Sequence, residues 1–164
     1  MTKCMLSQSE AEQLLKEEKI GRLSTFGDLY PYIVPLCYVY YKGKIYFHCG
    51  LKGQKLDNLR RNKKVCFQAD RILGYGKSSS PCSLSLDYKS VIVFGTATEV
   101  VDGIEKKEAL EALVTRFSGD RTLEPIPDKK LANTNIVRIH IDNMTAKANI
   151  HNNGSDGNLH NIKL

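Results

Sequence analysis

The sequence predicts a mainly β protein, a small antiparallel β-barrel with flanking helices. The chain has 164 residues, of which 41% are hydrophobic and 26% charged, and these are ordinary values for one soluble globular domain. Short segments rich in Tyr, Val, Ile and Leu recur between turn residues, which predicts about five or six strands joined mostly by hairpins. Strands and helices do not alternate regularly, which argues against a doubly wound parallel sheet.

A short helix and a strand open the predicted fold. Ser7–Glu10 has the spacing of a capping box, so we expect a helix that begins there and ends near Lys16. Leu14 and Leu15 are expected to face the core. The segment Ile20–Phe26 follows as a predicted strand.

A strand from about Tyr30 to Tyr41 is predicted next, because β-forming residues dominate it. Pro31 and Pro35 each remove one backbone donor, which is typical of an edge strand, a bulge, or a backbone that faces something other than a strand. Lys42-Gly43 indicates a two-residue hairpin turn. The returning strand is expected over Lys44–His48.

The middle of the chain predicts one helix and two strands. Gln54–Arg61 is expected to be a helix with Leu56 and Leu59 on its inner face, and Val65–Ala69 the next strand. Leu73–Ser85, rich in Gly and Ser, is predicted to be a long mobile loop. A long strand is expected from Asp87 to Val101, with a bulge at Gly95.

The last part of the chain predicts an amphipathic helix over Gly103–Ser118 and a final strand over Asn135–Asp142, with a loop around Pro125 and Pro127 between them. The apolar face of the helix is expected to consist of Leu110, Leu113, Val114 and Phe117. The polar composition after residue 148 predicts a barrel domain over 1–148 and a loosely held tail over 149–164.

Charge and cysteine content limit the partners and the compartment. The net charge is +6, and residues 52–64 hold six cations against one acid, so six minus one leaves +5 in that segment. This asymmetry predicts an anionic ligand there. No apolar run is long enough to span a bilayer and the N-terminus has no apolar signal core, so we expect a cytoplasmic chain without a membrane partner. The five cysteines form no Cys-x-x-Cys pair and the histidines lack ligand spacing, so no metal site is predicted.

The segment between the strand Lys44–His48 and the helix Gln54–Arg61 is the strongest candidate site. Lys52 precedes the helix and Lys55 lies in its first turn, where a cation opposes the helix dipole at a cost of about 0.3–1 kcal/mol. A bound phosphate would reverse this cost, because it accepts hydrogen bonds from the ammonium groups and from the free backbone N–H groups. The alternative is a solvated, screened surface patch.

No acid–base constellation is visible. His48 is either a hydrogen-bonded structural histidine or a reactive one. Cys49 follows it directly, so the two side chains leave opposite faces of a strand, which is poor geometry for a catalytic pair. An enzyme with this sequence would therefore rely on a cofactor for its chemistry.

The basic run Arg60–Lys64 has two interpretations. It is a candidate nucleic-acid contact. It also lies at a predicted helix C-terminus, where cations are favoured. We prefer the second interpretation and expect no nucleic-acid partner.

Several segments, in order and spacing, carry a family resemblance: Gly21–Thr25, Pro31–Leu36, Ile45–His48, Lys55–Leu59, Val65–Phe67, Pro81–Ser83, Tyr88–Val91, Phe94-Gly95 and Met144–Lys147. Together they resemble the pyridoxamine-phosphate-oxidase-related flavoproteins, and specifically their Nim-like branch, named for nitroimidazole resistance. The resemblance covers about residues 5 to 148. It implies a split β-barrel homodimer with FMN bound in two clefts between the subunits.

The resemblance also implies roles for particular residues. Those that would hold the FMN phosphate or line the cleft are Lys52, Lys55, His48, Cys49 and Gly50. Those that would lie behind the isoalloxazine ring are Val34, Pro35 and Leu36. Those that would come from the partner subunit are Tyr88 and Ser90.

The function implied is that of an FMN-dependent oxidoreductase, which passes electrons from a reduced donor to a small, flat substrate such as a nitroaromatic. The alternative is a non-catalytic protein of the same fold that binds flavin, deazaflavin or haem, with His48 as an axial haem ligand.

Overall fold

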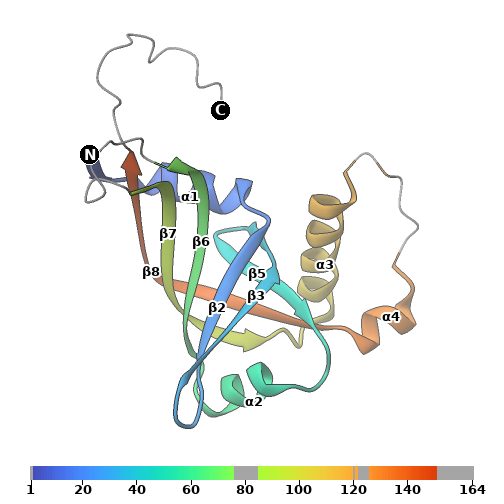
Figure 1. The fold of residues 1–164 in the computed structure, drawn as a ribbon. Helices are drawn as coiled ribbons and strands as arrows, with labels where there is room; N and C mark the ends of the chain where they lie inside the picture. The colour runs from blue at the N-terminus through green and yellow to red at the C-terminus, as the bar shows by residue number, and fades with distance from the viewer. Residues whose placement is uncertain (1, 76–84, 120, 122–125, 151–164) are drawn as a thin grey trace.

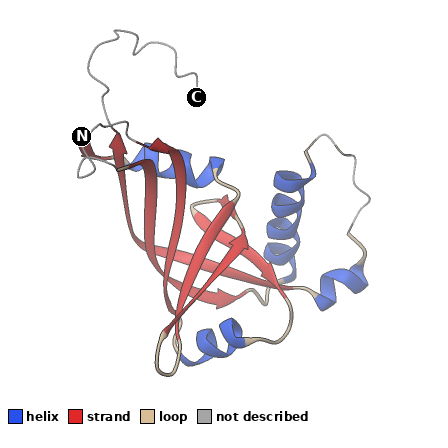
Figure 2. Ribbon diagram, viewed as in Figure 1, coloured by secondary structure: helices blue, strands red, loops and turns tan. Residues whose placement is uncertain are grey.

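Within residues 2–75, 85–119, 121 and 126–150, which the computed structural model describes, eight strands form one curled antiparallel sheet with helices on its outside (Figures 1 and 2). The strands are β1 (Thr2–Met5), β2 (Ile20–Phe26), β3 (Pro31–Cys37), β4 (Val39–Tyr41), β5 (Lys44–Cys49), β6 (Lys64–Tyr75), β7 (Leu86–Glu99) and β8 (Asn135–Ile150). The helices are α1 (Gln8–Glu17), α2 (Gln54–Arg61), α3 (Gly103–Ser118) and α4 (Asp128–Asn133).

The strand order explains why the sheet forms an incomplete barrel. The order is β3-β2-β6-β7-β8-β5-β4, with β1 beside the far half of β8. The two terminal strands, β3 and β4, follow each other in the chain, so the sheet must curl until β3 approaches β5. Among the described residues, β3 pairs only with β2. The sheet is therefore split between β3 and β5, as the predicted split barrel requires.

A bulge helps the sheet to curl. The register between β7 and β8 shifts between Phe94 and Gly95, so the sheet is irregular where a bulge was predicted, but the extra, unpaired residue is Asp142 of β8 and not Gly95 itself. A Cβ atom at Gly95 would lie 2.3 Å from the carbonyl oxygen of His140. Only glycine permits this approach of the two backbones, so the bend depends on that residue.

The predicted strand Tyr30–Tyr41 is two strands, β3 and β4, separated by Tyr38. The ring of Tyr38 is fully buried, with its centroid 4.8 Å from that of Phe67 and 5.6 Å from the guanidinium carbon of Arg116. The chain turns here because this ring enters the core. The turn carries the chain from one end of the sheet to the other.

The core inside the barrel is built from inward-facing residues of β2 to β8 and from parts of two helices. Leu14 and Leu15 of α1, and Leu56 and Leu59 of α2, are buried in it, as predicted. The capping box of α1 is present: the Ser7 N–H donates to Oε2 of Glu10 over 2.8 Å, and Ser7 Oγ accepts from the Glu10 N–H over 3.3 Å.

Helix α3 covers the outer side of β4, β5 and β8 (Figure 1). The buried residues of this second cluster are Val39, Tyr46, Val100, Ala109, Leu113 and Ile136. The predicted apolar face of α3 is partly wrong, because Phe117 is 39% exposed and the buried side chains come from the middle of the helix.

Some elements are longer than predicted, or were not predicted. Strand β6 continues to Tyr75, into the segment expected to be a loop from Leu73, and β8 runs well past Asp142. Pairing along β7 satisfies the backbone of both extensions, although their side chains are partly polar. Strand β1 and helix α4 were not predicted. Residues 76–84 of the expected loop and 151–164 of the expected tail lie outside the described residues.

No helix in the described part of the chain is both long and apolar enough to cross a lipid bilayer.

Candidate functional site

The loop after β5 leads into a helix whose N-terminus has no side-chain cap. The N-cap residue of α2 is Gly53, with φ 137°, a conformation that favours glycine. The carbonyl oxygen of Gly53 accepts from the N–H groups of Leu56 and Asp57 at 2.9 and 3.2 Å. The N–H groups that precede them in the first turn have no acceptor one helical turn back. They are therefore available to an anion at this end of the helix.

Lys55 stands beside the last residues of β5. Its Nζ lies 5.6 Å from the centroid of the Phe47 ring. Burial raises the pKa of the Cys49 thiol, and the charge of Lys55 acts in the opposite direction. Lys52 and Gly50 are exposed on the loop between them. Lys52 and Lys55 thus lie on the segment that joins the end of β5 to the first turn of α2.

Of the residues predicted to lie behind a flavin ring, two face the barrel core and one faces outward. The side chains of Val34 and Leu36 pack partly buried against the same core cluster as Cys49. Pro35 is exposed, because alternate residues of β3 point to opposite faces. His48 is exposed as well, and its side chain leaves β5 on the face opposite to Phe47 and Cys49.

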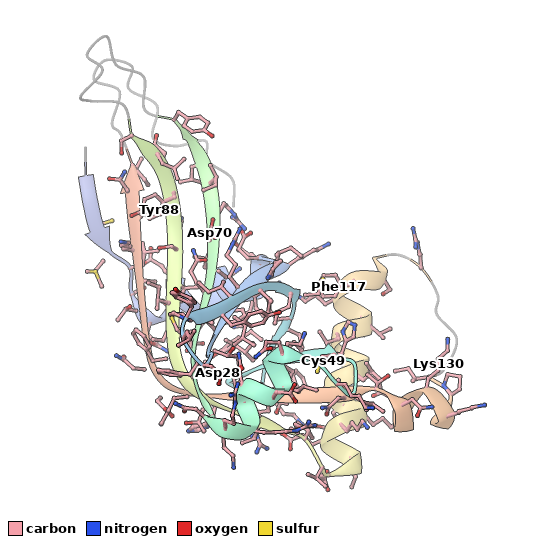
Figure 3. The ribbon with its side chains drawn as sticks, turned by 60° about the horizontal axis from the view of Figure 1, so that its bottom comes forward. Asp28, Cys49, Asp70, Tyr88, Phe117 and Lys130 are labelled. Atoms are coloured by element: carbon pink, nitrogen blue, oxygen red, sulfur yellow. The ribbon has the colours of Figure 1, made fainter. Side chains whose placement is uncertain are left out.

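Tyr88 and Ser90 lie elsewhere in the chain. Both are near the start of β7, whereas the part of β7 closest to β5 is its end at Glu99. Figure 3 shows Tyr88 along the far half of the long strands and Cys49 beside α2. A single chain therefore does not bring these two residues to the Lys52–Lys55 junction.

A buried hydrogen-bond network, which the sequence analysis did not identify, attaches α2 to the β2–β3 hairpin. Asn58 is fully buried, and its Nδ2 donates to Oγ1 of Thr25 over 2.9 Å. Its Oδ1 accepts from Nε2 of Gln54 over 2.8 Å and from Nη2 of Arg61 over 2.7 Å. The available signal was a polar residue between the two inner-face leucines of a predicted amphipathic helix.

The basic run at the end of α2 is largely paired. Arg60 donates to both oxygens of Glu99, and Arg61 forms an ion pair with Asp28 in the β2–β3 turn. Lys64 pairs with Asp142 over 2.9 Å. These contacts support the structural interpretation of the run over the nucleic-acid one.

A separate cavity of about 310 Å³ opens on the outer face of β2, β6 and β7. It is lined by Ser24, Thr25, Phe26, Pro31, Lys64, Val65, Cys66, Phe94, Gly95 and Asp142. None of the predicted site residues lines this cavity. The surrounding face is apolar and exposed: Ile33 is 62%, Phe26 58% and Phe94 51% exposed. An exposed apolar face of this kind is typical of an interaction surface.

Among the described residues, no three His, Cys, Asp or Glu side chains are grouped so that they could hold a metal ion.

The curled antiparallel sheet, split between β3 and β5 and flanked by helices, defines a split β-barrel. The chain belongs to the pyridoxamine 5'-phosphate oxidase family, whose sequence profile matches residues 7–148. The match extends from just before α1 almost to the end of β8, so it includes both the barrel and the β5–α2 junction.

Similar proteins agree with this family and fold. A candidate 5-nitroimidazole antibiotic resistance protein of Bacteroides thetaiotaomicron is 25% identical with a TM-score of 0.75, covering 90% of this chain and 87% of that one. An FAD-binding protein of Mesorhizobium loti is 25% identical with a TM-score of 0.69, covering 92% of this chain and 100% of that one. An uncharacterised protein of Rhizobium meliloti is 28% identical over 58% of this chain, and the match spans only 56% of that relative's length.

Proposed function

We propose that the chain binds FMN at the β5–α2 junction and acts as an FMN-dependent oxidoreductase on a small, flat, oxidised substrate such as a nitroaromatic. The observation that carries the proposal is the uncapped N-terminus of α2, with Lys52 and Lys55 beside it at the split of the barrel. Free N–H groups, a helix dipole and two ammonium groups suit the phosphate of FMN.

The residues present suit both ends of the cofactor. Lys55 and Lys52 would bind the phosphate, and the first-turn N–H groups would donate to it. Val34 and Leu36, which are partly buried along β3, offer an apolar edge against which a flat ring system can pack. A bound flavin would supply the electron-transfer chemistry, which amino-acid side chains of this kind do not provide.

The contribution of the chain is then to bind and orient the cofactor and to shield it from water. Lys52 and Lys55 fix one end of the cofactor, and β3 fixes the plane of the other. His48 is exposed on the face of β5 opposite to Phe47 and Cys49, so it would reach a bound flavin or substrate only from that outer side. Exclusion of water from the cofactor requires a second surface, because the outer side of β3, with Ile33 and Pro35, is exposed in a single chain.

A second copy of the chain would supply that surface. We propose a homodimer formed through the outer face of β2, β3, β6 and β7, where Ile33, Phe26 and Phe94 are exposed. Dimerisation would bury these side chains. It would also bring Tyr88 and Ser90 of one copy towards the junction of the other, and so unite residues that lie apart in one chain. The family membership and the FAD-binding neighbour support a flavin site, and the candidate nitroimidazole-resistance neighbour supports a nitroaromatic substrate.

Absorbance spectroscopy tests the cofactor. The purified protein, alone and after titration with FMN, is expected to show flavin bands and saturable binding, and Lys55→Glu is expected to lose the yellow colour. Full flavin retention by folded Lys55→Glu would contradict the site. A Soret band without flavin bands would instead identify a haem protein.

Turnover with a reduced nicotinamide nucleotide and a nitroaromatic tests the activity. Consumption of both, dependent on FMN, is expected. Tight FMN binding without turnover of any nitro compound would leave the non-catalytic alternative.

A further inference from the structure

Asn58 has an unusual position for a polar side chain. It lies on the inner face of α2 between the core residues Leu56 and Leu59, and it is fully buried. A buried amide is costly unless its polar atoms are hydrogen-bonded. The Asn58 amide meets this requirement with three side-chain partners: Gln54 and Arg61, at the two ends of α2, and Thr25 of β2.

The first partner is Gln54, the first residue of α2, whose Nε2 donates to Asn58 Oδ1 over 2.8 Å. Gln54 lies between Gly53 and Lys55, at the end of the helix that faces the proposed phosphate. The Asn58 amide therefore connects directly to the anion-facing turn of α2.

The second partner is Thr25 of β2, whose Oγ1 accepts from Asn58 Nδ2 over 2.9 Å and donates to the carbonyl oxygen of Tyr32 over 3.4 Å. Tyr32 is in β3, and Val34 is two residues further along the same strand. The network thus continues from the phosphate end of the proposed site into the strand behind the ring end.

The third partner is Arg61, which donates to Asn58 Oδ1 over 2.7 Å and pairs with Asp28 in the β2–β3 turn. Helix α2 is therefore held to the same hairpin at two points, through Thr25 and through Asp28. Figure 3 shows Asp28 in the hairpin turn beside α2.

Apolar contacts alone would not fix the helix in this way. Leu56 and Leu59 bury α2, but hydrophobic contacts are non-directional and allow a helix to rotate or slide by small amounts. Hydrogen bonds to a fully buried amide permit one arrangement, since any shift leaves a polar atom without a partner.

We infer that Asn58 and Thr25 are positioning residues that fix the anion-binding N-terminus of α2 relative to β3, and so match the site to the length of a phosphorylated flavin. This inference rests on the proposed FMN site. The network touches neither Lys52 nor Lys55 in the described contacts, so its effect on binding is exerted through the placement of the helix.

Thr25 offers a matched pair of variants. Thr25→Val keeps the shape of the side chain and removes the hydroxyl, which leaves Asn58 Nδ2 without this acceptor. Thr25→Ser keeps the hydroxyl. The affinities of each full-length apoprotein for FMN and for riboflavin, which lacks the phosphate, are measured by quenching of flavin fluorescence, and circular dichroism verifies folding.

Thr25→Val is expected to weaken FMN binding by about tenfold, in line with an unpaired buried donor at the helix that binds the phosphate. Riboflavin affinity should change by less than about twofold, and Thr25→Ser should stay close to wild type for both ligands. Equal weakening of FMN and riboflavin would overturn the inference, because it would show a general loss of stability. Unchanged FMN affinity in folded Thr25→Val would overturn it too.

A double-mutant cycle provides a second readout that a merely structural residue would not change. If the network acts by placing α2, then Thr25→Val should weaken FMN binding much less in a Lys55→Met background than in the wild-type background. If Thr25→Val weakened FMN binding by the same factor in both backgrounds, the inference would be contradicted. Absence of FMN binding by the wild-type protein would instead refute the proposed function, which separates the two failures.

Discussion

The ring of Phe67 in β6 occupies the space in the barrel core that a side chain at Gly21 of β2 would need. A Cβ atom at Gly21 would lie 2.0 Å from Cζ of Phe67. The Phe67 ring cannot move aside, because it is fully buried and packs edge-on against Tyr38 at 4.8 Å. The absence of a side chain at position 21 thus allows Phe67 and Tyr38 to occupy the centre of the barrel.

Gly21→Ala is therefore expected to destabilise the protein by about 1–3 kcal/mol through overpacking. Chemical denaturation with urea measures this loss. Gly103→Ala is the control, since a Cβ there meets no atom within 4 Å, and its stability should be unchanged or slightly raised. Phe67→Leu should lower the free energy of unfolding less in the Gly21→Ala background than in the wild type. An equal loss of stability in both backgrounds would show that the two positions do not compete for space.

The proposed phosphate site predicts that removal of either lysine weakens the binding of FMN but not that of riboflavin. Lys55→Met and Lys52→Met should each weaken FMN binding by about tenfold or more, since a hydrogen bond to a charged group contributes about 1.5–3 kcal/mol. Both should leave riboflavin binding nearly unchanged. Lys63→Met, in the same basic segment but after the end of α2, is the matched control. Titration at several salt concentrations should show a shallower salt dependence for the two site variants than for Lys63→Met.

The proposed dimer predicts that a charge placed on the exposed apolar face, but not elsewhere on the surface, dissociates the protein. Ile33→Lys places a charge on the exposed apolar face of β3 and is expected to shift the protein from dimer to monomer in sedimentation velocity, with weaker flavin binding. Val101→Lys is the control: Val101 is 93% exposed but precedes α3, away from that face. A monomeric wild type, or a dimer unaffected by Ile33→Lys, would contradict the proposed interface.

The contact between α3 and the sheet predicts a pH-dependent stability. Burial tends to raise the pKa of Glu105, but hydrogen bonds from Tyr46 and Arg138 and the charges of Arg138 and Lys44 outweigh it and hold the pKa below 4.5, its ordinary value. Because the pKa is lower in the folded state, the carboxylate stabilises the fold above about pH 4.5, and this contribution is lost as the pH falls through the folded pKa.

Glu105→Gln is expected to lower the free energy of unfolding at neutral pH by about 1–2 kcal/mol, through weaker hydrogen bonds to Tyr46 and Arg138. The difference from wild type should shrink as the pH falls below about 4.5. Denaturant titrations at a series of pH values measure this difference. Lys106→Gln, at the next position of α3, serves as the control. A difference that does not vary with pH would contradict the role of the charge.

The local sequence predicted much of the fold. The capping box at Ser7 and the buried pairs of leucines in α1 and α2 follow from short-range chemistry and are confirmed. The bulge expected at Gly95 is present at that level of the sheet, but its extra residue is Asp142 of the neighbouring strand β8. Errors occurred where distant residues decide the structure. Tyr38 interrupts a continuous β-like segment because its ring is needed in the core, and β6 extends to Tyr75 because β7 lies beside it. Neither fact is visible in the segment itself.

In the candidate site, too, the features set by local sequence could be predicted and those set by distant residues could not. Lys52 and Lys55 could be identified from their spacing at a helix N-terminus, and the structure places Lys55 Nζ 5.6 Å from the centroid of the Phe47 ring near the end of β5. The role of Asn58 depends on Thr25, which lies 33 residues away in the sequence, so no local pattern could reveal the pair. Tyr88 and Ser90 remain a prediction, because their contribution requires a second chain.

The two prolines of β3 have a consequence for how the protein behaves at high concentration. Strand β3 ends the sheet, and proline has no N–H to donate, so Pro31 and Pro35 interrupt the row of donors that a newly arriving strand would need. Sheet growth from molecule to molecule is therefore blocked at this border, while the neighbouring apolar face stays free for packing. The proposed face-to-face dimer would therefore leave this edge strand unable to extend the sheet into a fibril.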